Sequence, residues 1–170
     1  MSGKKFLLFI IIVLIISNFI FVFLFLKLNF FGKVIFDSEK FGASDLEIGF
    51  VTKVIDGDTI VVGGESIRLL GIDANEKGEK CYKEAKIRLE ELILNREIKL
   101  EKDVKDKDQY KRLLRYIFVE ENENSLINVN LILVEEGLAI ARFYEDKKYK
   151  KEILEAETKA RENQIGCKWS

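Results

Sequence analysis

The sequence predicts a mainly β domain with helices, of the α+β class. Five strands would close into a barrel beside about three helices, and one N-terminal transmembrane helix would precede them. Three observations lead to this prediction: β-rich segments separated by short turns, segments with helical periodicity, and a long uncharged run near the start. With 170 residues the chain has room for one domain and an appendage. We therefore expect a membrane anchor at residues 1–33, a stem at 34–47 and a folded domain at 48–170.

The anchor is predicted from the 21 residues between Phe6 and Leu26, none of which is charged. As a helix this segment would be about 30 Å long, which matches the thickness of a bilayer core. A buried helix of a soluble protein is a poorer explanation of this length and lack of charge. A cleaved signal peptide is a closer alternative, but no small-residue cleavage site follows the segment. We expect an uncleaved, single-pass anchor in the cell membrane.

The lysines around the anchor slightly favour a cytoplasmic N-terminus, which would place the domain outside the cytoplasm. They are Lys4 and Lys5 before the segment and Lys27 and Lys33 after it. The two cysteines, Cys81 and Cys167, bear on the same question, because in an exported domain they could form a disulfide. Two unrelated buried thiols are the alternative, since the sequence alone cannot show that the two residues meet.

The strands and helices of the domain follow from residue periodicity and turn signals. The β-rich segments are 48–55, 59–62, 66–72, 97–102 and 112–120. The segments with helical spacing are 79–95, 128–136 and 146–163. Gly63-Gly64 is a two-residue turn signal, and Gly137 is the expected C-cap of the second helix. Five strands with short antiparallel turns favour a small closed barrel, for which an OB-type barrel is the natural candidate.

Composition excludes several kinds of chemistry. The chain has no histidine, so a Ser-His-Asp triad, a Cys-His dyad and a histidine-based nuclease are all excluded. All 29 acidic residues and 24 of the 28 basic residues follow position 33, which gives that part a net charge of −5. Bulk charge therefore opposes nucleic-acid binding, and a nucleic-acid site here would need local positive charge from a metal ion and a few arginines.

The residues best suited to chemistry lie on one predicted hairpin and just after it. Asp58, Asp73 and Glu76 provide hard oxygen ligands or bases, and Arg68 provides a planar, permanent charge that matches a phosphate. This combination suits a divalent cation together with a phosphodiester. Plainer explanations exist, because an Asp-Gly-Asp run can be only a turn and Arg68 can be only a surface partner of Glu65 or Glu76.

Three motifs follow one another along the chain: Asp56-Gly-Asp-Thr59, Arg68-Leu-Leu-Gly-Ile-Asp73 with Glu76, and Asp108-Gln-Tyr-Lys-Arg112. In this order they resemble the staphylococcal nuclease (thermonuclease) family, whose members are calcium-dependent phosphodiesterases on an OB-fold. The segment Asn130-Leu-Ile-Leu-Val-Glu-Glu-Gly-Leu-Ala139 and the final Trp169-Ser170 are also similar to the family. The resemblance covers about residues 48–170, and its specificity comes from the order and spacing of the motifs.

The resemblance implies a role for each matching residue. The ligands of Ca²⁺ would be the carboxylates of Asp58 and Asp73 and the backbone carbonyl of Ala74. Glu76 would accept a proton from the attacking water or orient it. Arg68 and Arg112 would bind the phosphate and stabilise the transition state, and Tyr110 would lie near the nucleotide. The resemblance also implies cleavage of DNA and RNA with low sequence specificity, leaving 3′-phosphates, and we expect a monomer.

Two departures from the family pattern and one alternative function stay open. Relatives commonly have proline before the glutamate and glycine before the second arginine, where this chain has Asn75 and Lys111. Asn75 leaves the backbone beside Glu76 less restricted, and a positive φ at Lys111 would be costly. The alternative function is a non-catalytic OB-fold module that binds single-stranded nucleic acid.

The register of the predicted hairpin raises a geometric question. A turn at Gly63-Gly64 places Thr59 opposite Arg68, and simple alternation then puts Arg68 and Asp73 on opposite faces of the strand. A bend or bulge near Gly71 would bring the two side chains together.

Overall fold

The computed structural model describes residues 35–37, 46–122 and 125–170, which belong to one compact unit spanning Val34–Ser170. The expected membrane anchor lies outside these described residues. Among the helices of the described ranges, none is both long enough and apolar enough to cross a membrane.

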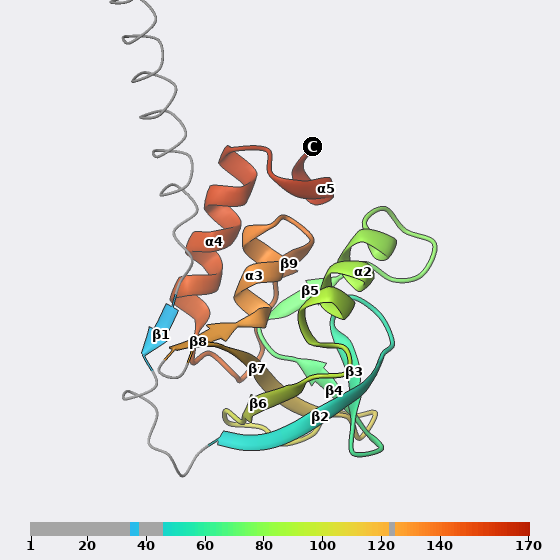
Figure 1. Ribbon diagram of the computed structural model, residues 1–170. Helices are drawn as coiled ribbons and strands as arrows, with labels where there is room; N and C mark the ends of the chain where they lie inside the picture. The colour runs from blue at the N-terminus through green and yellow to red at the C-terminus, as the bar shows by residue number, and fades with distance from the viewer. Residues whose placement is uncertain (1–34, 38–45, 123–124) are drawn as a thin grey trace, which may run out of the picture. The chain divides into compact units, whose positions relative to one another are not determined.

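Nine strands and four helices make up the described part of the chain (Figure 1). The strands are β1 (Ile35–Asp37), β2 (Leu46–Val54), β3 (Thr59–Val62), β4 (Glu65–Leu69), β5 (Ile72–Ala74), β6 (Glu97–Glu101), β7 (Leu113–Asn122), β8 (Ser125–Asn128) and β9 (Ala139–Ala141). The helices are α2 (Tyr82–Ile93), α3 (Val129–Glu135), α4 (Lys150–Glu162) and α5 (Gly166–Trp169). The predicted α+β class is confirmed.

Five of the strands close into a ring through their hydrogen bonds. β2 pairs with β3 and β6, β4 pairs with β3 and β7, and β7 pairs with β6. Within this ring the β4–β7 pair is parallel and the other pairs are antiparallel. These are the five strands that the sequence predicted. β8 extends the sheet from β7, and β1, which lies in the segment expected to be an irregular stem, pairs with β8.

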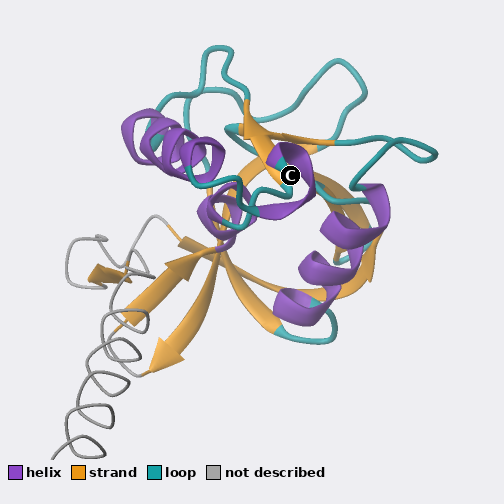
Figure 2. Ribbon diagram, turned by 90° about the horizontal axis from the view of Figure 1, so that it is seen from above, coloured by secondary structure: helices purple, strands orange, loops and turns teal. Residues whose placement is uncertain are grey.

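The barrel interior is packed with apolar side chains that alternate along the strands, because successive residues point to opposite faces of a strand. Side chains that are at most 1 % exposed come from all five strands of the ring: Val51, Ile60, Ile67, Ile98 and Ile117. Helix α2 buries Ala85, Leu89 and Ile93, as its periodicity predicted. Figure 1 shows α3 between α4 and α2 on one side of the barrel, and Figure 2 shows the same order from above. This side of the barrel therefore supports the helices, while the loops that hold the motifs lie at its edge.

The predicted strand 66–72 is broken at Gly71. β4 ends at Leu69, and β5 leaves the ring to pair with β9 instead. Gly71 has φ +76, and a Cβ at this position would lie 2.8 Å from the Cδ1 atom of Ile153. Glycine is required there both for the left-handed backbone and for the close approach. The bend anticipated near Gly71 is confirmed.

Several elements differ from their predicted bounds. Helix α2 begins at Tyr82 rather than at residue 79, because Cys81 has φ 70 and ends the preceding turn. Helix α4 begins at Lys150 rather than at residue 146. Asp103 instead accepts hydrogen bonds from the backbone N–H groups of Lys147 and Lys148, which holds that segment as a loop. β8, β9 and α5 were not predicted, because four residues or fewer are too short to show a period.

The disulfide that the sequence allowed is present. Cys81 and Cys167 are bonded, with their Cα atoms 5.5 Å apart and 86 positions apart in the sequence. The bond joins α5, near the C-terminus, to the start of α2. It therefore closes a long loop that contains α2, α3, α4 and two strands of the ring, β6 and β7.

Candidate active site

Three neighbouring strands bring the motifs to one edge of the barrel. Thr59 at the start of β3 pairs with Arg68 in β4, as the hairpin register predicted. The parallel pairing of β4 with β7 then places Arg68 opposite Leu114, so Arg112, just before β7, lies next to them. Residues that are more than 40 positions apart in the sequence thus share one site because of the strand order.

Close packing of Gly57 places Asp58 at this edge of the barrel. A Cβ on Gly57 would lie 2.6 Å from the Cβ of Ala74 and 2.7 Å from the Cβ of Ala85. Asp58 itself is 6 % exposed. Its Oδ2 accepts a 2.7 Å hydrogen bond from the N–H of Ala74, and its Oδ1 accepts a 3.1 Å bond from the Thr59 hydroxyl. The run is thus more than a turn, because its second aspartate is buried beneath β5.

Arg68 links the two aspartates. Its Nη1 lies 3.0 Å from Oδ2 of Asp58, and its Nη2 lies 2.8 Å from Oδ1 of Asp73. The bend at Gly71 is what turns Asp73 toward Arg68, since straight alternation would separate them. Arg68 is therefore not the surface partner of Glu65 or Glu76 that the plainer explanation offered.

Arg112 approaches the same cluster from the loop before β7. Its Nε lies 2.7 Å from Oδ2 of Asp108, and its Nη1 lies 3.5 Å from the Thr59 hydroxyl. Burial acts to raise the pKa of Asp108, but the side-chain and backbone hydrogen bonds from Arg112 outweigh it and lower that pKa below its ordinary value. Lys111 has φ 66, so the costly backbone conformation considered from the sequence does occur.

Two further predicted residues lie at the surface. Tyr110 is 70 % exposed, and the guanidinium of Arg112 lies 5.4 Å above its ring centroid. Core packing is therefore not its role. Glu76 is also exposed, and its carboxylate forms no hydrogen bond or ion pair with any described residue. Its backbone is held in a turn, because its N–H donates to Oε2 of Glu79 at 2.9 Å and its carbonyl accepts from the N–H of Glu79 at 3.0 Å.

Arg142 belongs to this cluster but was missed from the sequence. Its Nη1 lies 2.7 Å from Oδ2 of Asp73, so each oxygen of Asp73 has its own guanidinium partner. Arg142 also donates from Nε to the hydroxyl of Tyr144 at 2.8 Å. It follows β9, whose pairing with β5 places Ala141 opposite Ile72. No local signal marks it, because the contact depends on a strand of three residues.

The buried carboxylate of Asp58 has an unusual proton affinity. Burial raises its pKa to about 6, although Arg68, the N–H of Ala74 and the hydroxyl of Thr59 each act to lower it. An adjacent cation would favour the ionised form, because opposite charge lowers the pKa of a carboxyl group. A buried, partly destabilised carboxylate is thus a suitable ligand for a metal ion.

The donors at this edge suit a hard cation in kind. Asp58 and Asp73 offer carboxylate oxygens, and Ala74, which follows Asp73 and donates its N–H to Asp58, can offer its backbone carbonyl. In the described ranges no three His, Cys, Asp or Glu side chains come together as a metal cluster. Two carboxylates and one carbonyl are the set that the family resemblance implied, and such a set would leave the remaining positions of a Ca²⁺ ion to water and substrate oxygens.

The fold and the site define a class: an α+β barrel protein that presents the carboxylates of Asp58 and Asp73 with three guanidinium groups at one edge. The chain belongs to the staphylococcal nuclease homologue family, whose family model matches residues 66–170. The matched range contains Arg68, Asp73, Glu76 and Arg112 and begins after Asp58. The family resemblance predicted from the motifs is confirmed.

Individual relatives cover similar shares of the chain. It is 35 % identical over 131 residues to a micrococcal nuclease of Shigella flexneri, and the aligned region covers 72 % of this chain and 73 % of that protein. It is 33 % identical over 126 residues to a thermonuclease of Staphylococcus intermedius, which spans 68 % and 72 % respectively. It is 34 % identical over 151 residues to an uncharacterized protein of Methanocaldococcus jannaschii, which spans 72 % of each chain.

Proposed function

We propose that this protein is a calcium-dependent nuclease that hydrolyses phosphodiester bonds of DNA and RNA with low sequence specificity and leaves 3′-phosphates. The observation that supports it best is the guanidinium of Arg68, which lies 3.0 Å from Asp58 and 2.8 Å from Asp73. A planar cation between two carboxylates is poised to exchange partners with a phosphate and a metal ion. The names of the relatives, micrococcal nuclease and thermonuclease, favour the same activity.

Asp58, Asp73 and the carbonyl of Ala74 are the groups that would hold Ca²⁺. When bound, the ion would offset the charge of the phosphodiester and polarise its phosphorus. The N–H of Ala74 fixes Asp58 by a 2.7 Å hydrogen bond, and Arg142 fixes Asp73 by a 2.7 Å ion pair. Both carboxylates are thus oriented by groups that lie behind them, as ligands of a metal ion usually are.

The chemistry at phosphorus falls to three side chains. Glu76 would take a proton from the attacking water, whose oxygen forms a bond to phosphorus as the bond to the 5′ oxygen breaks. Arg68 and Arg112 would bind the equatorial oxygens, where negative charge develops. Glu76 is exposed, which suits a base that must reach a water molecule on the substrate side. Recognition through phosphate and sugar oxygens alone would explain low sequence specificity.

The barrel and the location of the protein are parts of the same proposal. We assign the ring of five strands to the OB-fold, because OB barrels are small, five-stranded and partly helix-capped.

We also propose that the uncharged segment between Phe6 and Leu26 anchors a monomer in the cell membrane with its domain outside the cytoplasm. The Cys81–Cys167 disulfide supports an oxidising location. Protease treatment of intact cells would degrade the domain if it is outside and spare it if it is inside.

A cleavage assay with defined metals tests the activity. Plasmid DNA and single-stranded DNA and RNA would be incubated with the full chain in Ca²⁺, in Mg²⁺ and in chelator, beside the Glu76→Gln variant. We expect cleavage in Ca²⁺ that chelator abolishes and that the variant slows by about 10² or more. A folded protein that binds single strands but cleaves none of the substrates would identify a non-catalytic binding module instead.

A further inference from the structure

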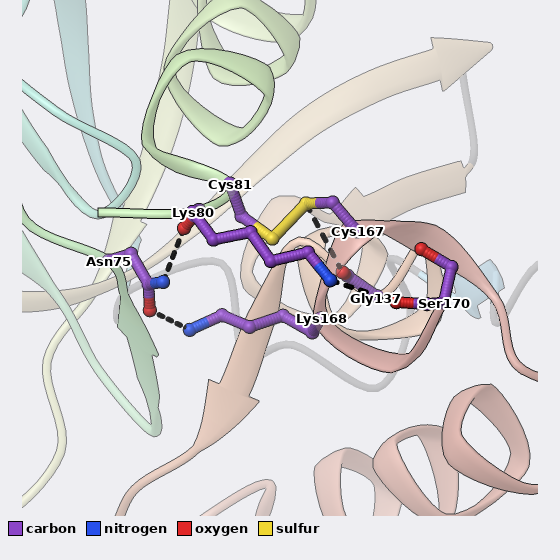
Figure 3. Close-up of a disulfide and its surroundings, with 7 residues drawn as sticks. All are labelled: Asn75, Lys80, Cys81, Gly137, Cys167, Lys168 and Ser170. Carbon is purple, nitrogen blue, oxygen red and sulfur yellow. Dashed lines mark hydrogen bonds between the residues drawn. A yellow bond between two sulfur atoms is a disulfide. The ribbon is translucent and has the colours of Figure 1, made fainter. Parts of the chain in front are cut away.

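Asn75 lies between the proposed carbonyl ligand Ala74 and the proposed base Glu76, and both ends of its side chain are engaged. Its Nδ2 donates a hydrogen bond to the carbonyl oxygen of Lys80, and its Oδ1 accepts one from Nζ of Lys168 (Figure 3). The amide side chain of Asn75 thus links the first residue of the loop 75–80 to its last residue. That amide is in turn held by a lysine from the far end of the chain.

Lys168 belongs to the last four residues, Cys167–Ser170, which we call the C-terminal clamp. Three contacts join the clamp to residues 75–81: Lys168 with Asn75, Lys80 Nζ with the Ser170 carbonyl oxygen at 2.8 Å, and the Cys81–Cys167 disulfide (Figure 3). A fourth contact, from the N–H of Lys168 to the carbonyl of Gly137 at 3.1 Å, joins the clamp to the turn that follows α3.

The ammonium of Lys168 is partly buried and faces the proposed active site. Burial lowers its pKa below the ordinary value, whereas the carboxylates of Asp73, Glu79 and Asp58 act to raise it. These carboxylates include both proposed metal ligands. The hydrogen bond from Lys168 to Asn75 thus restrains the loop next to these carboxylates.

We propose that the C-terminal clamp positions the loop 75–80 for catalysis, with Lys168 as the positioning residue and the disulfide as the bond that keeps it in place. The inference rests on the proposed nuclease function for its effect on rate. Asn75 stands where relatives commonly have proline, and a proline would restrict the backbone by itself. In this chain the restriction comes instead from hydrogen bonds to the side chain of Asn75.

The clamp depends on the disulfide because α5 is only four residues long. A helix of that length is unstable alone, because the free-energy cost of helix nucleation exceeds the stabilisation from a single turn of hydrogen bonds. Dithiothreitol would convert the disulfide to two thiols and become a cyclic disulfide itself. We therefore expect the proposed nuclease to lose rate when it is reduced, even where the barrel remains folded.

Kinetics on four variants test the positioning role. Lys168→Ala and Asn75→Ala should each lower kcat by about tenfold or more, because a displaced base is poorly aligned, while KM changes by less than about twofold. The kcat of the double variant should lie within about twofold of that of the slower single variant. Each single variant already removes the same Lys168–Asn75 hydrogen bond, so the two effects should not add. Lys168→Arg should recover most of the rate. Lys151→Ala, on an exposed lysine of α4, is the matched control and should leave kcat unchanged.

The state of the clamp can be measured without any nuclease activity. Trp169 is the one tryptophan of the chain and lies within the clamp. On reduction, we expect its fluorescence to shift to longer wavelength and to be quenched more strongly by acrylamide, and the amides of residues 76–80 to exchange faster. The Cys81→Ser/Cys167→Ser variant should show both changes already and should not respond to dithiothreitol.

The outcomes separate the clamp from the nuclease. Unchanged Trp169 emission and unchanged exchange at residues 76–80 in reduced protein would overturn the clamp whatever the activity. An unchanged kcat in Lys168→Ala, in a preparation whose wild type is active, would overturn its positioning role. If the wild type cleaves no substrate while both optical and exchange signals respond as expected, the proposed function fails and the clamp as a structural device stands.

Discussion

Arg68 is the residue that connects the two proposed metal ligands. Its guanidinium has two nitrogens directed at two different carboxylates, 3.0 Å from Asp58 and 2.8 Å from Asp73. A lysine ammonium is a single point of charge on a flexible stem and cannot reproduce this spacing. The shape of the side chain, and not only its charge, is therefore expected to matter.

Replacing Arg68 by lysine should expose this dependence on shape. We expect Arg68→Lys to lower kcat/KM for cleavage by about 10² or more, since a lost donor at developing charge has an effect of that size. Steady-state cleavage of a fluorescent oligonucleotide in Ca²⁺ would measure it. Arg96→Lys is the matched control, because Arg96 is exposed and its guanidinium donates to the backbone carbonyl of Leu92 at 3.3 Å. Equal rates for the two variants would contradict the role given to Arg68.

Asp58 should make the stability of the metal-free domain depend on pH. Its pKa is about 6 in the folded protein against an ordinary 3.8, so between these values the folded state keeps a proton that the unfolded state has lost. The contribution of Asp58 to the free energy of unfolding therefore falls as pH rises from about 4 to about 6, by on the order of 1–3 kcal/mol. Asp58→Asn should not show this fall.

Urea unfolding in chelator from pH 4 to 7.5 would measure the difference between wild type and Asp58→Asn. Taking the difference removes the opposite pH dependence of Asp108, whose lowered pKa adds stability above its ordinary range. The free energy of unfolding of Asp58→Asn should increase relative to that of the wild type as pH rises. Ca²⁺ should remove this relative increase at neutral pH. A difference that is constant with pH would show that Asp58 titrates normally.

At the scale of elements, close backbone contacts at glycines connect the pieces of the fold. Gly137, after α3, has φ +62, and a Cβ there would lie 1.9 Å from the carbonyl oxygen of Ile165. That oxygen is a backbone atom and cannot turn away. The end of α3 and the turn before α5 thus meet at a point that only glycine can occupy.

Gly137→Ala should destabilise the domain by on the order of 3 kcal/mol, because the added methyl forces two backbones apart. Gly63→Ala is the matched control, since Gly63 has φ +57 but nothing within 4 Å of the added Cβ. That variant should lose only the backbone penalty of about 1 kcal/mol. Urea unfolding of both variants would give the comparison. Similar losses would mean that the turn before α5 yields easily.

The loop before β7 contains a second strained position. Lys111 has φ 66, and its N–H donates to the carbonyl of Asp108 at 3.1 Å in a tight turn. Lys111→Gly should raise the free energy of unfolding by about 1 kcal/mol, because glycine adopts this conformation without a clash. The melting temperature would measure the gain. A loss of stability would show that the lysine side chain offsets its own backbone cost.

The sequence predicted the elements that depend on local pattern and missed those that depend on distant pairing. The hairpin register of Thr59 with Arg68 and the bend at Gly71 followed from one turn signal and one glycine. The proposed site residues that lie on this hairpin therefore met as expected. The approach of Arg142 to Asp73 could not be predicted, because it depends on β9 pairing with β5 across 69 positions.

The same limit applies to the C-terminal clamp. Lys168 and Asn75 are 93 positions apart, and no periodicity relates them. The two cysteines were the one sequence signal that the end of the chain could meet the start of α2, and the pairing was only one of two explanations. Glu76 is the reverse case, since its motif was clear from the sequence while its carboxylate forms no hydrogen bond or ion pair with a described residue.

At the scale of the whole molecule, the disulfide joins the C-terminal end of the folded unit to the start of α2. It closes a loop of 86 residues, so reduction should lower the free energy of unfolding by about 4 kcal/mol through the entropy of the unfolded chain. For a domain of this size the melting temperature should fall by about 10 °C or more. Calorimetry with and without dithiothreitol would measure it. An unchanged melting temperature would mean that the bond restrains α5 alone.

The net charge of −5 after position 33 means that the bulk charge of the folded domain does not attract nucleic acid. Binding must come from the edge where Arg68, Arg112 and Arg142 gather, together with the metal ion that the aspartates would hold. The central claim is therefore that this one edge hydrolyses a phosphodiester.

End-group analysis of a single cleaved oligonucleotide tests this claim most directly. A 5′-labelled DNA strand would be incubated with the full chain in Ca²⁺, and the labelled products would be examined for a 3′-phosphate by treatment with a phosphatase. We predict labelled fragments that end in 3′-phosphate, formed in Ca²⁺, absent in chelator and formed more slowly by about 10² or more with Arg68→Lys. Intact substrate in Ca²⁺, or fragments that form equally well with chelator, would contradict the account.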